Sequence, residues 1–167
     1  VELADRLCEG VIKTVVNNAP VAISNNDDYA SRAEIMWAGV LAHNDLVGMG
    51  READWASHGM EHEISAIYDI AHGAGLAMIY PAWMKYVYKN DPARFAMFGK
   101  NVFGLEVDVD NLEQSALRTI HALEEFYKSI GMPTRMSDFD IDDTHIDEMA
   151  SKATANGTKT IGNFVKL

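Results

Sequence analysis

The sequence predicts an all-α protein, a helical bundle of about seven helices. Along most of the 167 residues the apolar side chains recur every three or four positions, which is the period of a helix. No segment shows a convincing alternation of apolar and polar residues, the pattern of a half-buried strand. Apolar residues make up 48% of the chain and charged residues 23%, a balance typical of one globular domain of this length.

Two helices are expected before residue 50. Over residues 2–18 an apolar side chain stands at every fourth position, which predicts one stripe of a helix, formed by Leu3, Leu7, Val11 and Val15. The asparagine pair before Pro20, together with that proline, is expected to end this helix. The next helix is expected to begin at about Asp27 or Asp28, because an acidic start suits the helix dipole, and to stop near Gly48 and Gly50.

The middle of the chain predicts two further helices with a break between them. The periodic pattern continues over residues 55–70. Gly73 and Gly75 then favour a break or a bend. The pattern resumes over residues 76–90, where Pro81 is expected to kink the helix or divide it.

Capping residues mark the remaining elements. An aspartate-proline pair is expected to open a helix over residues 93–103, with the aspartate as N-cap and the proline at the first helical position. Residues 108–131 predict a long amphipathic helix that a glycine closes. Residues 132–142 are typical of a loop, and a last short helix is expected over residues 142–157.

Charge and cysteine content exclude several classes of partner. The net charge is −11, with 25 acidic against 14 basic residues, so neither nucleic acid nor an anionic membrane surface is an expected partner. No apolar run approaches the roughly 20 residues that a membrane-spanning helix needs, and no secretory signal pattern is expected. The single cysteine, Cys8, rules out a disulfide within the chain and indicates the cytoplasm.

Three of the six histidines fall within fifteen residues: His58, His62 and His72. His58 and His62 share one helix face, and Asp54 lies one turn earlier on that face, where its carboxylate could orient the His58 ring. On a straight helix His72 would lie about 21 Å beyond His58, too far for one metal ion to bind both. The chain must therefore turn between them, and residues 69–75 include residues that permit a turn.

Spacing alone leaves both a metal site and a structural cluster open. Two imidazoles do not complete a divalent site, and a histidine on an apolar helix is often only a hydrogen-bonded core residue. The H-E-x-x-H pattern that begins at His62 has Ala66 in its second histidine position. The acidic run 138–143 lacks the glycine of a calcium loop, so a solvated loop and helix start are expected there. No G-x-G-x-x-G follows a strand, so no dinucleotide fold is expected in this chain.

The histidines belong to a longer stretch, DWASHGMEHEISAIYDIAHGAGLAMIYPAW, in which the third histidine precedes a glycine fourteen residues after the first. This stretch resembles the iron-containing (group III) alcohol dehydrogenases, and within them the branch of NADH-dependent butanol dehydrogenases. The segments ADRLCEGVIKTVV, YASRAEIMWAG and FYKSIGMPTRMSDF are similar to the same branch. The resemblance therefore covers nearly the whole chain.

The resemblance implies a parent protein with an N-terminal α/β domain that binds the nicotinamide nucleotide and a C-terminal helical domain that carries the metal. Residues 1–167 are similar only to the second, a domain of the dehydroquinate-synthase-like type, so we expect a C-terminal helical metal-binding fragment that lacks the nucleotide-binding domain. By the resemblance, His58 and His72 are ligands of Fe²⁺ or Zn²⁺, beside an aspartate and a histidine that precede this fragment. His62 is implied to lie near nicotinamide and substrate as a catalytic proton relay.

By the same resemblance, the parent interconverts aldehydes and primary alcohols with NADH or NADPH, which the missing domain would mainly bind. The parent is expected in the cytoplasm, and a homodimer is one alternative for its oligomeric state. Trp55, Tyr68 and Trp83 are candidates for lining the substrate path, although core filling is favoured for each. For His62, packing against the cofactor cleft remains the alternative. The fragment alone is expected to bind metal weakly and to be inactive, and a non-catalytic helical scaffold or binding module with structural histidines remains the second interpretation.

Overall fold

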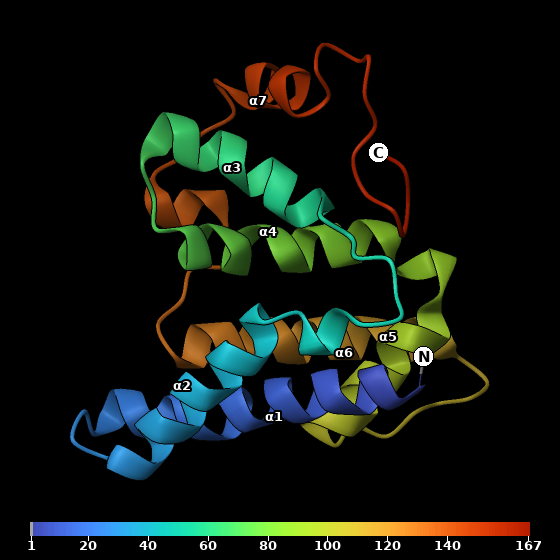
Figure 1. The fold of residues 1–167 in the computed structure, drawn as a ribbon. Helices are drawn as coiled ribbons and strands as arrows, with labels where there is room; N and C mark the ends of the chain where they lie inside the picture. The colour runs from blue at the N-terminus through green and yellow to red at the C-terminus, as the bar shows by residue number, and fades with distance from the viewer. Residues whose placement is uncertain (1) are drawn as a thin grey trace. The chain divides into compact units, whose positions relative to one another are not determined.

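The computed structural model describes residues 2–167, and these residues form seven α-helices and no strand. Helices α1 to α7 span, in order, Glu2–Ser24, Tyr29–His43, Ala56–Tyr68, His72–Val87, Pro92–Phe98, Leu112–Ser129 and Ile146–Ala153 (Figure 1). Shorter helical turns lie at Leu46–Gly48, Tyr88–Asn90, Gly99–Phe103 and Met136–Phe139. The predicted all-α fold class is confirmed for this part of the chain. None of these helices has the length and apolarity needed to cross a membrane.

The chain divides into two compact units. The first combines the residues up to Glu52 with Asp91–Ile130, and the second combines Ala53–Asn90 with Gly131–Leu167. In the first unit α1 packs against α2 and α5 packs against α6, whereas in the second α3 packs against both α4 and α7. No change of composition along the sequence indicates these boundaries.

Helix α1 continues through Pro20 to Ser24, so the prediction that it ends near this proline is wrong. Ala19 and Ala22 on either side of Pro20 are buried, and α1 packs along α2. Burial of this helical surface compensates for the one hydrogen bond that a proline removes. The apolar stripe expected on this helix does not define its buried face, because Leu3 is 69% exposed.

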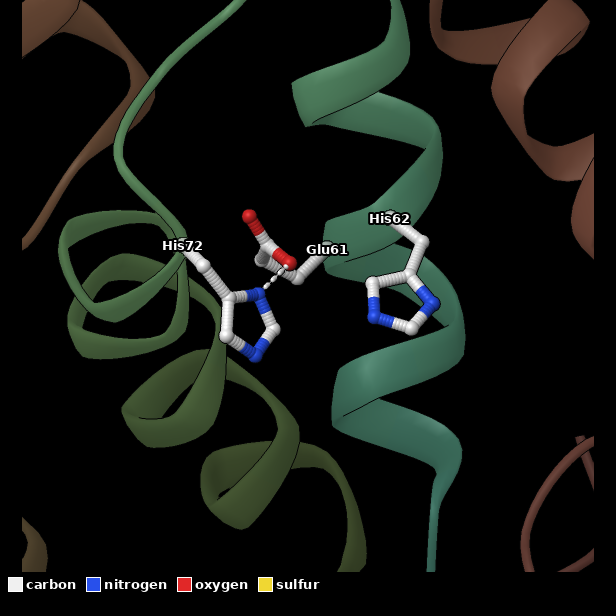
Figure 2. Close-up of side chains that lie close together, drawn as sticks. All are labelled: Glu61, His62 and His72. Carbon is white, nitrogen blue, oxygen red and sulfur yellow. Dashed lines mark hydrogen bonds and ion pairs between the residues drawn. The ribbon is translucent and has the colours of Figure 1, made fainter.

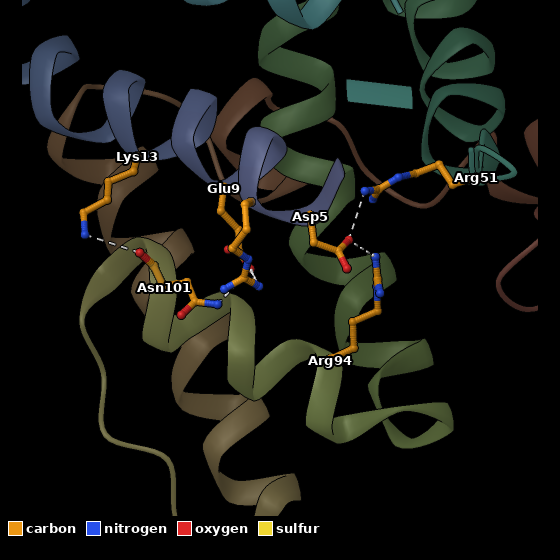
Figure 3. A network of polar contacts seen from close by, with 7 residues as sticks. Asp5, Glu9, Lys13, Arg51, Arg94 and Asn101 are labelled. Atoms are coloured by element: carbon orange, nitrogen blue, oxygen red, sulfur yellow. Dashed lines mark hydrogen bonds and ion pairs between the residues drawn. The ribbon is translucent and has the colours of Figure 1, made fainter. Parts of the chain in front are cut away.

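A polar network links separate segments of the first unit (Figure 3). The carboxylate of Asp5 forms ion pairs with Arg51 and Arg94, each with an N–O distance of 3.0 Å. Lys13 Nζ donates to the backbone carbonyl of Asn101 over 3.3 Å. Burial alone would raise the pKa of Asp5, but the two guanidinium groups outweigh it and lower that pKa. Asp5 therefore joins α1 to two segments that are distant from it in sequence.

Two helices with a capping side chain, α2 and α5, start close to where the sequence predicts them. Asp28 accepts a hydrogen bond from a backbone N–H in the first turn of α2, and Asp91 does the same for α5. The end predicted for α2 near Gly48 and Gly50 is wrong, since α2 ends at His43. Asn44 Oδ1 accepts from the N–H of Leu46, and this local bond competes with continuation of the helix.

The second unit has its own hydrophobic cluster, formed by Ile64, Met78, Ile141 and Met149. Helix α4 passes through Pro81 without being divided, and Pro81 itself is buried. The loop predicted over 132–142 contains one helical turn. Within it Asp138 accepts hydrogen bonds from the backbone N–H groups of Thr134 and Arg135, so this part of the acidic run supports a turn.

Candidate metal centre

The chain turns between α3 and α4 at the three residues that separate them. Asp69 follows α3 in the left-handed conformation with φ of 50°, which aspartate tolerates better than most residues, and Ala71 is extended before α4. The turn predicted between His58 and His72 is confirmed, although it lies just ahead of His72. The break predicted at Gly73 and Gly75 is wrong, because both lie in α4.

This turn brings the three imidazoles together, because α3 and α4 pack against each other. The ring centroids of His58 and His72 lie 5.4 Å apart, and those of His62 and His72 are also 5.4 Å apart. The His58 and His62 rings are separated by 6.3 Å along α3. Residues that would lie about 21 Å apart on one straight helix are thus close enough to share a ligand.

Glu61 is part of the same cluster, and sequence reasoning missed it. Its side chain is completely buried, and one carboxylate oxygen contacts Nδ1 of His72 (Figure 2). The hydroxyl of Ser65 donates to the other oxygen. Glu61, His62 and His72 each offer a ligand atom within 4.8 Å of the other two. A signal for Glu61 existed, since it shares the buried side of α3 with Ser57 and Ile64, where a charged residue is unusual.

His58 is the histidine whose environment best fits a metal ligand. Its Nδ1 atom is buried and has no hydrogen-bond partner among the described residues. Burial, followed by the neighbouring imidazoles of His72 and His62, lowers the pKa of His58. A neutral imidazole is the form that binds metals. The unpartnered nitrogen and the approach of His72 therefore fit a transition-metal ion.

Asp54 does not hold the His58 ring in the way that its spacing suggested. Asp54 Oδ1 accepts from the N–H of Ala56 over 2.8 Å, at the start of α3. Its Oδ2 accepts from the N–H groups of Asn163 and Phe164, each over 2.7 Å. Asp54 thus ties the C-terminal segment to the beginning of the helix that carries His58.

The three aromatic residues proposed for a substrate path differ in their surroundings. Trp55 is 62% exposed and meets the His58 ring edge to face at 4.8 Å, so the favoured core role is wrong for it. Trp83 stacks on Tyr80, with ring centroids 5.6 Å apart, which agrees with packing. Tyr68 lies edge to face with His145 at 6.0 Å. Trp55 alone of the three contacts the histidine cluster through a ring contact between described residues.

The structure is therefore an all-helical chain in which two packed helices gather three imidazoles and a buried carboxylate. The family model described as "Fe-containing alcohol dehydrogenase family, C-terminal" matches residues 1–167, and the chain belongs to this family. The resemblance read from the sequence is confirmed.

Individual relatives agree with this assignment. The chain is 40% identical over 163 residues to the probable NADH-dependent butanol dehydrogenase 1 of Bacillus subtilis, covering 98% of this chain and 42% of that protein. It is 38% identical to NADH-dependent butanol dehydrogenase A of Clostridium acetobutylicum, and the match covers 96% of this chain and 41% of that protein. The crystal structure of NADH-dependent butanol dehydrogenase A from Thermotoga maritima superposes with a TM-score of 0.92 at 36% identity, covering 99% of this chain and 43% of that one. The chain thus spans less than half the length of these relatives.

Proposed function

We propose that this chain is the C-terminal, metal-carrying part of an NAD(P)H-dependent alcohol dehydrogenase of the butanol dehydrogenase type, which interconverts aldehydes and primary alcohols. The main observation that supports this proposal is the pair formed by His58 and His72, whose ring centroids are 5.4 Å apart across the α3–α4 turn. The names of the relatives, butanol dehydrogenases that depend on NADH, support the substrate class and the nucleotide. An N-terminal domain of the complete protein would bind most of the nucleotide.

His58 and His72 would hold one Fe²⁺ or Zn²⁺ ion, together with ligands from outside this chain. When bound, the metal would supply Lewis-acid polarisation of the substrate oxygen and the reduced nicotinamide would supply the hydride. His58 contributes a neutral ring with a free nitrogen, which is supported by its buried, unpartnered Nδ1. His72 contributes a ring whose Nδ1 side is already engaged by Glu61.

His62 would supply the proton that the alcohol product needs. Its side chain is exposed within the described residues, and its ring lies 5.4 Å from that of His72. An imidazole titrates near neutral pH and is the commonest general acid in enzymes. Aldehyde reduction consumes one hydride and one proton, and His62 would deliver the proton to the substrate oxygen.

The complete protein would act in the cytoplasm, where the unpaired Cys8 stays reduced.

Metal analysis of the complete protein with His58→Ala and His72→Ala tests this function. Both variants should lose bound metal and aldehyde reduction while the helical circular dichroism signal is retained. His121→Ala is the matched control, because His121 is an exposed histidine of α6, outside the cluster, and this variant should keep both properties. If both cluster variants keep their metal and their activity, the histidines are structural and a non-catalytic helical module becomes the better description.

A further inference from the structure

We infer that Glu61 is a positioning residue that orients His72 for metal binding, an inference that rests on the proposed function. The Glu61 carboxylate accepts a hydrogen bond from the Nδ1–H of His72 (Figure 2). This leaves Nε2 of His72 as the nitrogen that binds the metal. Metal-binding histidines commonly donate their second ring N–H to a carboxylate, which fixes the tautomer and makes the ligating nitrogen more basic. Glu61 supplies such a carboxylate from α3 to a histidine on α4.

His72 needs an external support for its ring. It is the first residue of α4, directly after the turn, and its side chain is 50% exposed. Within the described residues, packing therefore covers only half of this side chain and does not by itself select one ring orientation. Among the described residues, the ring donates its hydrogen bond to Glu61, whose own side chain is 0% exposed. A buried, fixed acceptor holding a half-exposed donor is the arrangement expected of a positioning group.

Both oxygens of Glu61 have a partner within this chain, which favours a positioning role over direct metal ligation. One oxygen faces Nδ1 of His72, and the hydroxyl of Ser65 donates to the other. A buried carboxylate is tolerated only when such partners satisfy it. Helix α4 also leaves room for this side chain, since Gly75 has no Cβ to collide with it. Glu61 is thus anchored by contacts within this chain.

The experiment measures the affinity of the metal-free complete protein for Co²⁺, read from the visible absorption bands of the bound ion. Glu61→Gln should weaken Co²⁺ binding by about 10- to 100-fold, the usual effect of removing such a partner, and leave the band positions unchanged. Glu63→Gln is the matched control, because it removes the same charge two residues away on α3, and it should bind Co²⁺ like the wild type.

Ser65→Ala provides a second variant in case Glu61→Gln does not fold. It keeps the carboxylate and loosens its anchor, so Co²⁺ affinity should fall by about fivefold, the equivalent of one net hydrogen bond. Unchanged affinity in the folded Glu61→Gln and Ser65→Ala variants would overturn the inference. Altered band positions in Glu61→Gln would also overturn it, because they would make Glu61 a ligand. If His58→Ala and His72→Ala also bind Co²⁺ normally, the proposed function fails, an outcome distinct from failure of the Glu61 role alone.

Discussion

The side chain of Glu61 lies in the space that a side chain on Gly75 would need. A Cβ at residue 75 would lie 2.5 Å from Oε1 of Glu61 and 2.7 Å from its Cγ. Gly75→Ala should therefore displace the carboxylate and reduce the free energy of unfolding by about 1–3 kcal/mol, the usual cost of overpacking a core. Denaturant unfolding measures this loss, and Co²⁺ affinity should fall with it.

Gly73→Ala is the control for this prediction. Gly73 lies in the same turn of α4, but a Cβ there would meet nothing within 4 Å. Alanine is the better helix former, so this variant should be as stable as the wild type or up to about 1 kcal/mol more stable. Equal effects of the two substitutions would show that Glu61 is not packed against residue 75.

The first unit has a similar close approach between Gly99 and Thr119. A Cβ at residue 99 would lie 2.0 Å from Oγ1 of Thr119, which is fully buried on α6. Gly99→Ala should lower the free energy of unfolding by about 1–3 kcal/mol, and Thr119→Ala in the same chain should restore part of it. A double-mutant cycle by denaturant unfolding measures this coupling. Purely additive effects would contradict the contact.

Local signals in the sequence were sufficient for several elements. The starts of α2 and α5 were predicted because Asp28 and Asp91 cap their own helices, and this contact needs no information from elsewhere in the chain. The continuation of α1 past Pro20 was missed because packing against α2 stabilises it. The early end of α2 was missed because the side chain of Asn44 competes for a backbone group.

In the candidate site, too, some features were predictable from local sequence and others depended on packing between distant segments. The turn between His58 and His72 was predictable because the residues between them permit one, whereas spacing alone left both a metal site and a structural cluster open. Glu61 was not predicted, since its contact with His72 depends on how α4 packs against α3. The role expected for Asp54 was wrong for a comparable reason, because the distant residues Asn163 and Phe164 occupy its carboxylate.

The ion pairs of Asp5 predict a dependence of stability on acid pH. The pKa of Asp5 is lowered in the folded chain, below its ordinary value of 3.8, because Arg94 and Arg51 outweigh the effect of burial. The contribution of ionised Asp5 to the free energy of unfolding should therefore be complete above the pKa that Asp5 has in the unfolded chain. It should be lost as pH falls through the pKa that Asp5 has in the folded chain. Asp5→Asn should cost about 1 kcal/mol near pH 7. Denaturant unfolding of both proteins from pH 7 to pH 2 should show the two stabilities converging in acid, and a constant difference would contradict the lowered pKa.

The proton role of His62 predicts a selective catalytic defect. His62→Ala in the complete protein should keep its bound metal and lower kcat for aldehyde reduction by about 10²- to 10⁴-fold. Because imidazole is the group that this substitution removes, added imidazole should restore part of the rate. Steady-state kinetics with and without imidazole measure both effects. An unchanged kcat would support simple packing against the cofactor cleft instead.

The most direct measurement of the central claim is the position of the metal in crystals of the complete protein loaded with Zn²⁺, located by anomalous scattering at the zinc edge. The account predicts one peak about 2.1 Å from a ring nitrogen of His58 and from Nε2 of His72, with Glu61 still in contact with Nδ1 of His72. A peak whose ligands exclude either histidine, or no peak between α3 and α4, would contradict it.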